Sequence, residues 1–140
     1  MRFNQEQQEK IFQRTSGYCH ICHKKLSLYQ YAAEGESGSW EVEHSKPQAK
    51  GGTHRLNNLY PACISCNRSK GAKSTRSARA KHGKTRAPLS LNKRRKAKTI
   101  NALKGALLGS VSGIFLTIDI AGACVIVGML IGYLRNPDHD

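Results

Sequence analysis

An acid and an imidazole stand side by side at Glu43-His44, and an amide follows at Asn67. Hydrolysis of a phosphodiester needs a base that activates water, and a histidine with a pKa near neutrality can take that proton. Carboxylate and amide oxygens suit Mg2+ or Mn2+, and such an ion can stabilise the charge that develops on a phosphate. The three residues predict metal-dependent hydrolysis of a phosphate ester, whereas Glu43-His44 alone would be an ordinary surface pair.

Four of the five cysteines form two Cys-x-x-Cys pairs: Cys19, Cys22, Cys63 and Cys66. Each pair can offer two thiolates from one turn, and a structural zinc ion takes four ligands in a tetrahedron. The first ten residues are polar, without the apolar run of an export signal, so we expect a reducing compartment in which such pairs bind metal instead of forming disulfides. The sequence predicts a structural zinc site, in preference to four buried thiols that bind no metal.

We expect structural roles for three further residues. We expect His20 and His23 to be exposed neighbours of the zinc ligands, because four thiolates already complete the coordination shell. Cys124 lies in an apolar stretch and is interpreted as a small buried hydrophobic residue.

Two short strands and a helix must position the acid, the histidine and the amide. Residues 40–44 alternate and are rich in strand-forming residues, and residues 59–62 follow a polar loop as a second strand. A helix is predicted from Cys63 to about residue 70, so that Asn67 lies in its first turns. Residues 26–33 are compatible with a strand or an irregular loop.

A short N-terminal helix is predicted at residues 4–14. Asn4 is a plausible N-cap, Gln7 follows three residues later in a capping-box pattern, and Gly17 marks the stop. This helix has few apolar residues and must pack against another element. Because a domain of about 70 residues has a thin core, zinc binding, on the order of 10 kcal/mol, would contribute much of its folding free energy.

Together these motifs resemble the HNH endonuclease family. The resemblance covers about residues 10–73 and rests on Glu43-His44, Pro47, Gly51-Gly52, Asn58-Leu59 and Cys63-x-x-Cys66-Asn67-x-x-Lys70-Gly71. It implies a small α+β fold, a zinc-stabilised ββα-metal domain. It also implies that His44 is the general base, that Glu43 and Asn67 bind a catalytic Mg2+ or Mn2+, and that Asn58 orders the loop that aims His44.

The sequence departs from the family pattern at two positions. Asn67 stands where the family name has its last histidine, and Glu43 replaces an aspartate. Asn58 fits the middle position of the motif better than Asn57. His54 is interpreted as a loop residue.

The charge distribution predicts a polyanionic partner. The chain of 140 residues has a net charge of +14, and residues 44–118 contain 17 Lys and Arg but no acid. We expect DNA as the partner, with phosphate contacts from Arg68, Lys70 and Lys73. Residues 1–73 would form the nuclease domain, and residues 74–98 a basic linker or tail that is disordered until it meets a polyanion, or simply a solvated linker.

Residues 99–135 form an apolar, glycine-rich helical segment, followed by a polar tail at residues 136–140. One membrane span at about 111–134 fits its composition, and so does a hairpin that turns near Asp119 to Gly122. G-x-x-x-G spacings suggest close helix contacts, including self-association. The basic run before this segment favours a membrane-anchored protein whose nuclease domain is cytoplasmic.

The leading prediction is therefore a metal-dependent endonuclease that cleaves DNA and is tethered to a membrane. Two alternatives remain. A non-catalytic zinc module that binds nucleic acid would keep the cysteines and the basic tail but would not need Glu43, His44 and Asn67 together. A membrane-active protein with a vestigial nuclease head would depend on residues 99–135 instead.

Overall fold

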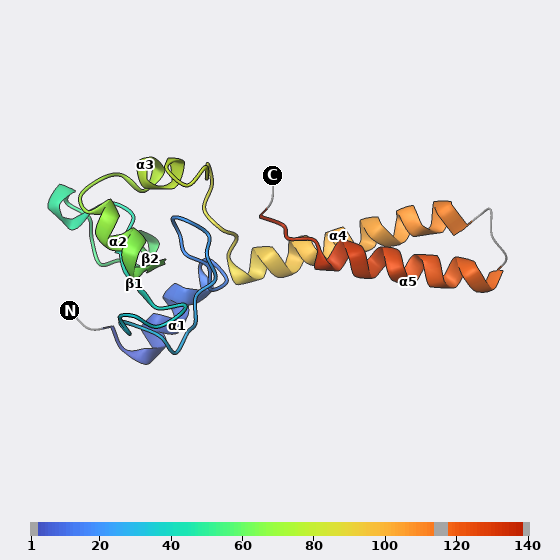
Figure 1. The fold of residues 1–140 in the computed structure, drawn as a ribbon, viewed down its shortest axis with the longest axis horizontal. Helices are drawn as coiled ribbons and strands as arrows, with labels where there is room; N and C mark the ends of the chain where they lie inside the picture. Colours follow the sequence, from blue (N-terminus) through green and yellow to red (C-terminus); the bar gives the residue numbers. More distant parts are fainter. Residues whose placement is uncertain (1–2, 114–117, 139–140) are drawn as a thin grey trace. The chain divides into compact units, whose positions relative to one another are not determined.

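The computed structural model describes residues 3–113 and 118–138. The chain divides into an N-terminal unit, Met1–Leu91, and a C-terminal unit, Asn92–Asp140. Figure 1 shows a small α+β fold in the first unit and two long helices in the second. The elements of the N-terminal unit are α1 (Gln5–Gln13), β1 (Trp40–His44), η1 (Gln48–Lys50), η2 (Leu56–Asn58), β2 (Leu59–Cys63), α2 (Ile64–Lys70) and α3 (Thr75–Ala80).

Helix α1 begins with the capping box that the sequence predicted. The side chain of Asn4 accepts a hydrogen bond from the backbone N–H of Gln7 at 2.8 Å, and the Gln7 side chain accepts one from the N–H of Asn4 at 3.1 Å. Two N–H groups that lack a partner within the helix are thereby satisfied. The predicted N-terminal helix is confirmed, and its buried residue Ile11 packs into the core.

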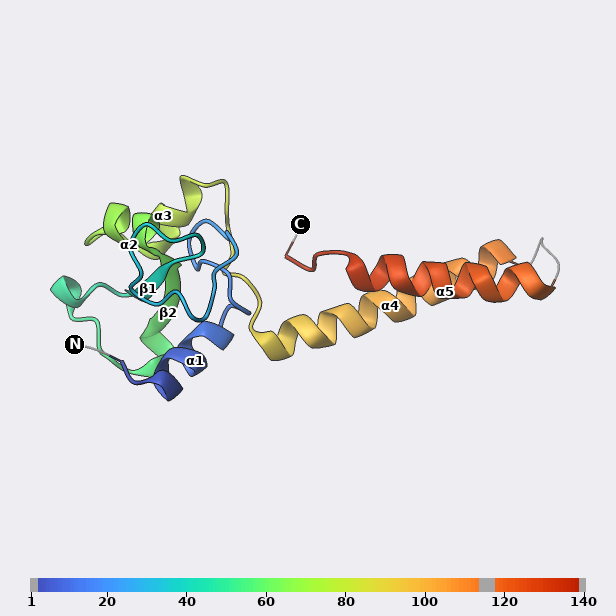
Figure 2. The same cartoon turned by 60° about the horizontal axis from the view of Figure 1, so that its bottom comes forward.

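Strands β1 and β2 form an antiparallel hairpin, and α2 follows β2 directly (Figure 2). Their register pairs Trp40 with Cys63 at one end and His44 with Leu59 at the other. The two predicted strands and the helix after them are confirmed, and with them the small α+β fold. Residues 26–33 form an irregular segment in which Tyr31 makes one isolated bridge to Trp40.

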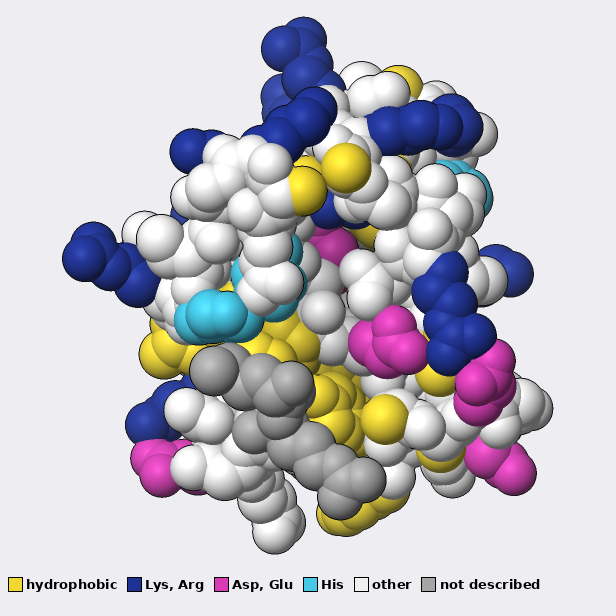
Figure 3. Space-filling view, turned by 90° about the vertical axis from the view of Figure 1, so that its left-hand side faces the viewer, with side chains coloured by type: hydrophobic (Ala, Val, Ile, Leu, Met, Phe, Trp, Pro, Cys, Tyr) yellow, Lys and Arg dark blue, Asp and Glu magenta, His cyan; other side chains and the backbone are white. Residues whose placement is uncertain are grey.

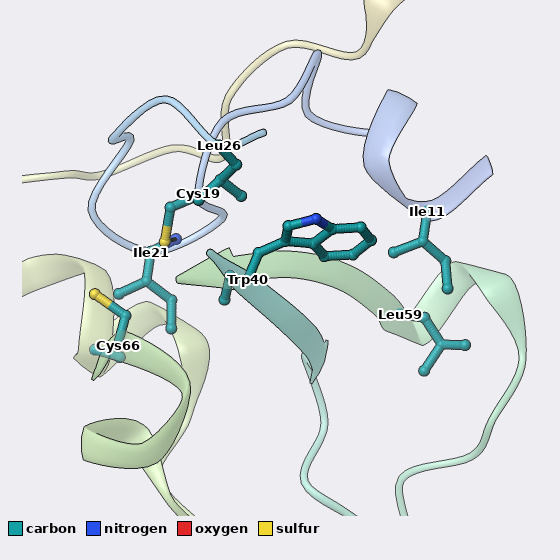
Figure 4. Packing of buried hydrophobic residues seen from close by; sticks show 9 residues of the cluster. Ile11, Cys19, Ile21, Leu26, Trp40, Leu59 and Cys66 are labelled. Carbon is teal, nitrogen blue, oxygen red and sulfur yellow. Dashed lines mark hydrogen bonds between the residues drawn. The ribbon is translucent and has the colours of Figure 1, made fainter. Parts of the chain in front are cut away.

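Trp40 lies at the centre of the hydrophobic core. Figure 4 shows its indole between two groups of side chains, with Cys19, Ile21 and Cys66 on one side and Ile11 and Leu59 on the other. The Phe12 ring approaches the indole at 5.3 Å and the Tyr31 ring at 4.9 Å, as centroid distances. Because Cys19 and Cys66 belong to this cluster, the cysteine site and the core form one packed unit.

The basic segment 74–98 differs from the predicted disordered linker. It contains α3, whose Thr75 and Ala78 are buried against the N-terminal unit, and it ends within α4 (Leu91–Gly113). The boundary between the two units lies at Leu91, well beyond residue 73. Composition suggested a linker because the segment is rich in Lys and Arg, but α3 buries Thr75 and Ala78, and the Thr75 hydroxyl donates to Glu43.

The C-terminal unit contains α4 and α5 (Ile118–Leu134), which run antiparallel as in the predicted hairpin alternative. The expected turn near Asp119 is not at that position, because α5 has already begun there, and residues 114–117 lie outside the described part. The side chain of Cys124 is also outside it. Among the described residues, no helix combines the length and apolar composition required for crossing a membrane.

Glycines form the contact between α4 and α5. A Cβ atom on Gly105 would lie 1.9 Å from the carbonyl oxygen of Gly128, and one on Gly132 would lie 2.1 Å from that of Asn101. Only glycine permits so close an approach of two backbones. The G-x-x-x-G spacing suggested self-association, but Gly105, Gly128 and Gly132 instead let two helices of the same chain pack closely.

Candidate active site and metal centre

The four paired cysteines converge on one point between the N-terminal loop and the β2–α2 junction. The Sγ atoms of Cys19, Cys22, Cys63 and Cys66 all lie within 4.8 Å of one another. The Sγ atoms of Cys22 and Cys63 are 3.8 Å apart, and tetrahedral zinc with bonds of about 2.3 Å requires about the same separation. The four cysteines are therefore positioned to form the predicted metal site, and thiolate donors suit zinc.

The four thiols lie against one another, so they differ in how readily each loses its proton. Side-chain contacts from Cys19 and then Cys22 hold the pKa of Cys63 far below its usual range. Contacts with Cys19 and then Cys63 raise the pKa of Cys22. The contact with Cys22 lowers the pKa of Cys19, but contacts with Cys63 and Cys66 outweigh it, so that the pKa of Cys19 is raised. The backbone N–H of Cys63 points at the Sγ of Cys19 at 3.4 Å, as does that of Ile21. Such N–H groups stabilise negative charge on sulfur, and metal binding requires deprotonated thiols.

His20 is buried, contrary to the prediction that it is an exposed neighbour of the zinc ligands. Only 2% of its surface is accessible, its ring stacks on Tyr60 at 3.8 Å between centroids, and Nδ1 lies 3.0 Å from Oε2 of Glu43. Burial is the main cause that lowers the pKa of His20. A neutral His20 can therefore donate its Nδ1–H to the carboxylate of Glu43.

Glu43 is fully buried, and its carboxylate is held by protein groups. Lys70 Nζ lies 3.0 Å from Oε1, and the hydroxyl of Thr75 donates to the same oxygen at 2.8 Å. Burial by itself would raise the pKa of Glu43, but His20, Thr75 and Lys70 outweigh it and hold the pKa below its usual range. The carboxylate is thus charged and fully engaged at neutral pH.

Asn67 has a different partner from Glu43. Its Nδ2 donates to Oε2 of Glu41 at 2.9 Å. The two expected ligands of the catalytic Mg2+ or Mn2+ are therefore not directed at a common point, and an ammonium group already neutralises the carboxylate of Glu43. In this arrangement the pair does not fit a divalent cation, and we assign no catalytic step to one.

His44 lies at the end of β1, where it is partly accessible. Its Nε2 is 3.1 Å from Nδ1 of His54 and 3.3 Å from Nε2 of Gln48. Partial burial first, and then the neighbouring His54, lower the pKa of His44. Its backbone carbonyl accepts a hydrogen bond from Lys70 at 2.9 Å. The imidazole is therefore neutral at neutral pH and attached to a fixed backbone.

The loop after His44 is held by Asn58. Its Oδ1 accepts a hydrogen bond from the N–H of Lys46 at 2.7 Å, and its Nδ2 donates to the carbonyl of Lys46 at 3.0 Å and to that of Thr53 at 2.9 Å. Gly52 lies so close to this loop that a Cβ atom would be 1.8 Å from the carbonyl oxygen of Lys46. Together they close the loop and bring His54 to His44.

The three cations expected to contact phosphates have different environments. Lys73 is exposed on the segment after α2. Arg68 is exposed but pairs with Glu34 and, at 3.5 Å, with Glu41. Lys70 differs from the expectation, because it is 4% exposed and is directed inward to Glu43.

His44, His54 and Asn67 line one open cleft of about 740 Å3, together with Glu41 and Gln48. Apolar residues such as Tyr31 and Val42 complete its wall. Figure 3 shows one face of the molecule on which histidine side chains gather beside an apolar patch, with Lys and Arg side chains projecting around it. With Gln8, which also lines it, the cleft offers two imidazoles, a carboxylate and three amides to a ligand.

The residues that sequence reasoning missed are Glu41, Gln48, His20 and Thr75. Glu41 stands two positions before Glu43, and side chains two positions apart on a regular strand lie on the same face. This spacing could have indicated Glu41, and the side chains of Glu41 and Glu43 both contact α2. The roles of His20 and Thr75 depend on contacts across more than 20 residues, and no local pattern indicates them.

Residues 19–73 match the family model described as HNH endonuclease. The matched segment runs from Cys19, the first of the four converging cysteines, to three residues past α2, and it includes β1, β2 and the His44 loop. No curated protein and no solved structure shows a detectable match to the chain. The family match and the four converging cysteines lead to one conclusion: the chain carries an HNH endonuclease-family domain at residues 19–73.

Proposed function

We propose that this protein is an endonuclease that hydrolyses phosphodiester bonds of DNA, with His44 as the general base. The observation that carries the proposal is a partly exposed imidazole, with a lowered pKa, in an open cleft of an HNH-family domain. The net charge of +14 suits a polyanionic substrate.

The surroundings of His44 suit a base. A general base must be unprotonated at the working pH and must keep one ring nitrogen available for the proton of water. The low pKa meets the first condition. Gln48 and His54 occupy Nε2 of His44 through side chains of an exposed loop, and a phosphate with its attacking water can replace these contacts.

Asn58 serves as a positioning residue in this proposal. It fixes the backbone of the loop that follows His44, whereas His54 contacts Nε2 of His44 only until the substrate replaces it. Misplacement by about 1 Å can cost on the order of a hundredfold in rate, so Asn58 affects turnover more than DNA binding.

The zinc centre serves stability in this proposal. Cys19, Cys22, Cys63 and Cys66 hold the ion, which joins the N-terminal loop to the beginning of α2. This connection fixes Asn67, the residue directly after Cys66, beside Glu41. The need for Mg2+ or Mn2+, which the family resemblance implies, remains a separate proposal.

The test is cleavage of supercoiled plasmid by the zinc-loaded full chain, in Mg2+, in Mn2+ and in a buffer freed of other divalent cations before the protein is added. We expect nicked or linear products, and a loss of about 10²–10⁴-fold in rate for His44→Ala. His23→Ala is the control: His23 lies near the zinc site, outside the described cleft.

The same assay separates the enzyme from a zinc module that only binds nucleic acid. Such a module would shift the plasmid in a gel without cutting it under any metal condition. Equal cutting by wild type and His44→Ala would contradict the role of His44. Full activity without added Mg2+ or Mn2+ would contradict the need for a second divalent cation and would leave the role of His44 unchanged.

A further inference from the structure

The packing of the α4–α5 hairpin is the reverse of that expected for a pair of helices in water. Glycines make its closest contacts, since Gly105 faces the backbone of Gly128 and Gly132 faces the backbone of Asn101 at distances that exclude a Cβ atom. A water-soluble helix pair instead places its large apolar side chains in the contact. Small residues in the contact are typical of helices that pack in lipid.

The large apolar side chains of the hairpin face outward. Leu103 and Leu107 on α4 are 62% and 68% exposed, and Ile126, Leu130 and Ile131 on α5 are 68%, 57% and 65% exposed. They lie on both helices and leave no polar face along the described part of α5 beyond residue 125. An apolar patch of this extent marks a surface that another apolar phase covers.

The open end of the hairpin is polar and basic. Five cations lie in the first turns of α4: Lys93, Arg94, Arg95, Lys96 and Lys98. Arg94 contacts Asn136 at 3.1 Å and also Asp138, which joins the two ends of the hairpin. Where this basic end meets the apolar part, Lys98 Nζ lies 4.8 Å from the centre of the Tyr133 ring.

This order of charge, aromatic ring and apolar surface matches one side of a lipid bilayer. Anionic headgroups attract a basic cluster, tyrosine and lysine favour the interface, and the outward leucines and isoleucines suit hydrocarbon. Lys104 lies about 9 Å beyond Lys98 along α4, and its long side chain can extend back toward the headgroups.

We propose that the α4–α5 hairpin is a surface for an anionic phospholipid bilayer, which it enters from one face. Helix α5 has 17 residues, or about 25 Å, against a hydrocarbon thickness of about 30 Å, so the hairpin inserts without crossing. Both of its ends then lie on one side. This places the C-terminal tail on the same side of the bilayer as the basic start of α4, unlike a single span.

Flotation of the zinc-loaded full chain with vesicles tests this proposal, and the result does not depend on DNA cleavage. We expect binding to vesicles of phosphatidylcholine and phosphatidylglycerol that persists in 1 M NaCl. Ile126→Asp/Leu130→Asp should reduce binding at least tenfold. Tyr29→Asp/Leu56→Asp is the matched control, with the same charge change at exposed apolar residues of the N-terminal unit, and should bind as wild type does.

Three outcomes would overturn the proposal. The first is that the wild-type chain does not float with vesicles of phosphatidylcholine and phosphatidylglycerol. The second is binding that 1 M NaCl abolishes and the Ile126→Asp/Leu130→Asp variant retains, which indicates electrostatic adsorption alone. The third is that the wild-type chain sediments as a closed oligomer and does not float with vesicles. A second copy of the chain would then cover the apolar surface.

A topology measurement keeps the test independent of how well the aspartate variant folds. A protease added outside the vesicles should remove a tag placed after Asp140 from the wild-type chain and leave the α5 peptide protected. A protected tag would contradict insertion from one face.

Discussion

The buried pair of Lys70 and Glu43 yields the sharpest stability prediction. Lys70→Met removes the ammonium group that lies 3.0 Å from Oε1 of Glu43, where both side chains are at most 3% exposed. The carboxylate keeps His20 and Thr75 as hydrogen-bond donors but loses its cation. Methionine has a similar length and apolar volume, so the substitution changes the charge far more than the packing.

Breaking a buried ion pair by removing one partner costs about 3–5 kcal/mol, because the other charge stays buried. Since His20 and Thr75 remain at Glu43, we expect the lower end, about 3 kcal/mol. A domain of this size changes its melting temperature by about 4–8 °C per kcal/mol. The predicted loss is therefore at least about 12 °C, a large part of the usual stability of about 5–15 kcal/mol.

The fluorescence of Trp40 measures this loss in the full chain. Trp40 is the only tryptophan, is fully buried and lies in the N-terminal unit, so its emission follows the unfolding of that unit in urea at saturating zinc. Lys73→Met is the control, since Lys73 is exposed and its loss should change stability by less than about 0.5 kcal/mol. Lys70→Met/Glu43→Gln should regain most of the lost stability, because neither charge then remains.

A loss below about 1 kcal/mol for Lys70→Met would refute the reasoning. Such a value would mean that Glu43 is stabilised without Lys70. A double variant as unstable as Lys70→Met alone would likewise show that the two side chains are not coupled through charge.

Four further outcomes follow from the same structure. Zinc chelation should unfold the N-terminal unit and shift Trp40 emission to longer wavelength, with retained native emission as the contrary result. Gly52→Ala should slow plasmid cleavage at least tenfold at unchanged DNA affinity, because the Cβ atom would strike the loop that carries His54. Gly105→Val should separate α4 from α5, which increased protease sensitivity of the C-terminal unit would reveal. Because the pKa of His44 is lowered from 6.5, cleavage should stay constant between about pH 7 and pH 8 and fall only below pH 6.5, and a midpoint above 6.5 would contradict this.

Local signals predicted much of the fold. The capping box at Asn4, the alternating strand at residues 40–44 and the helix after Cys63 depend on neighbours within a few positions, and all appear in the structure. The spacing of the cysteine pairs predicted the metal site, because structural zinc takes four ligands at one point and two Cys-x-x-Cys pairs can supply them.

Contacts between distant segments could not be predicted in the same way. The partners of Glu43 come from residue 20 and from residues 70 and 75, and the last of these lies in a segment that its composition suggested was disordered. Hydropathy likewise could not distinguish one span from a hairpin, because both arrangements have the same apolar composition; the close contact of Gly105 with Gly128 distinguishes them.

Chemical rescue of His44→Gly tests the central claim most directly. Glycine removes the imidazole and leaves space for a free imidazole beside the scissile phosphate of a short DNA duplex. We predict that His44→Gly binds the duplex as tightly as wild type does, cleaves it at least about a hundredfold more slowly, and regains activity with added imidazole but not with pyrrole, which lacks a basic nitrogen. Cleavage by His44→Gly at the wild-type rate without imidazole would contradict the assignment of His44 as the base.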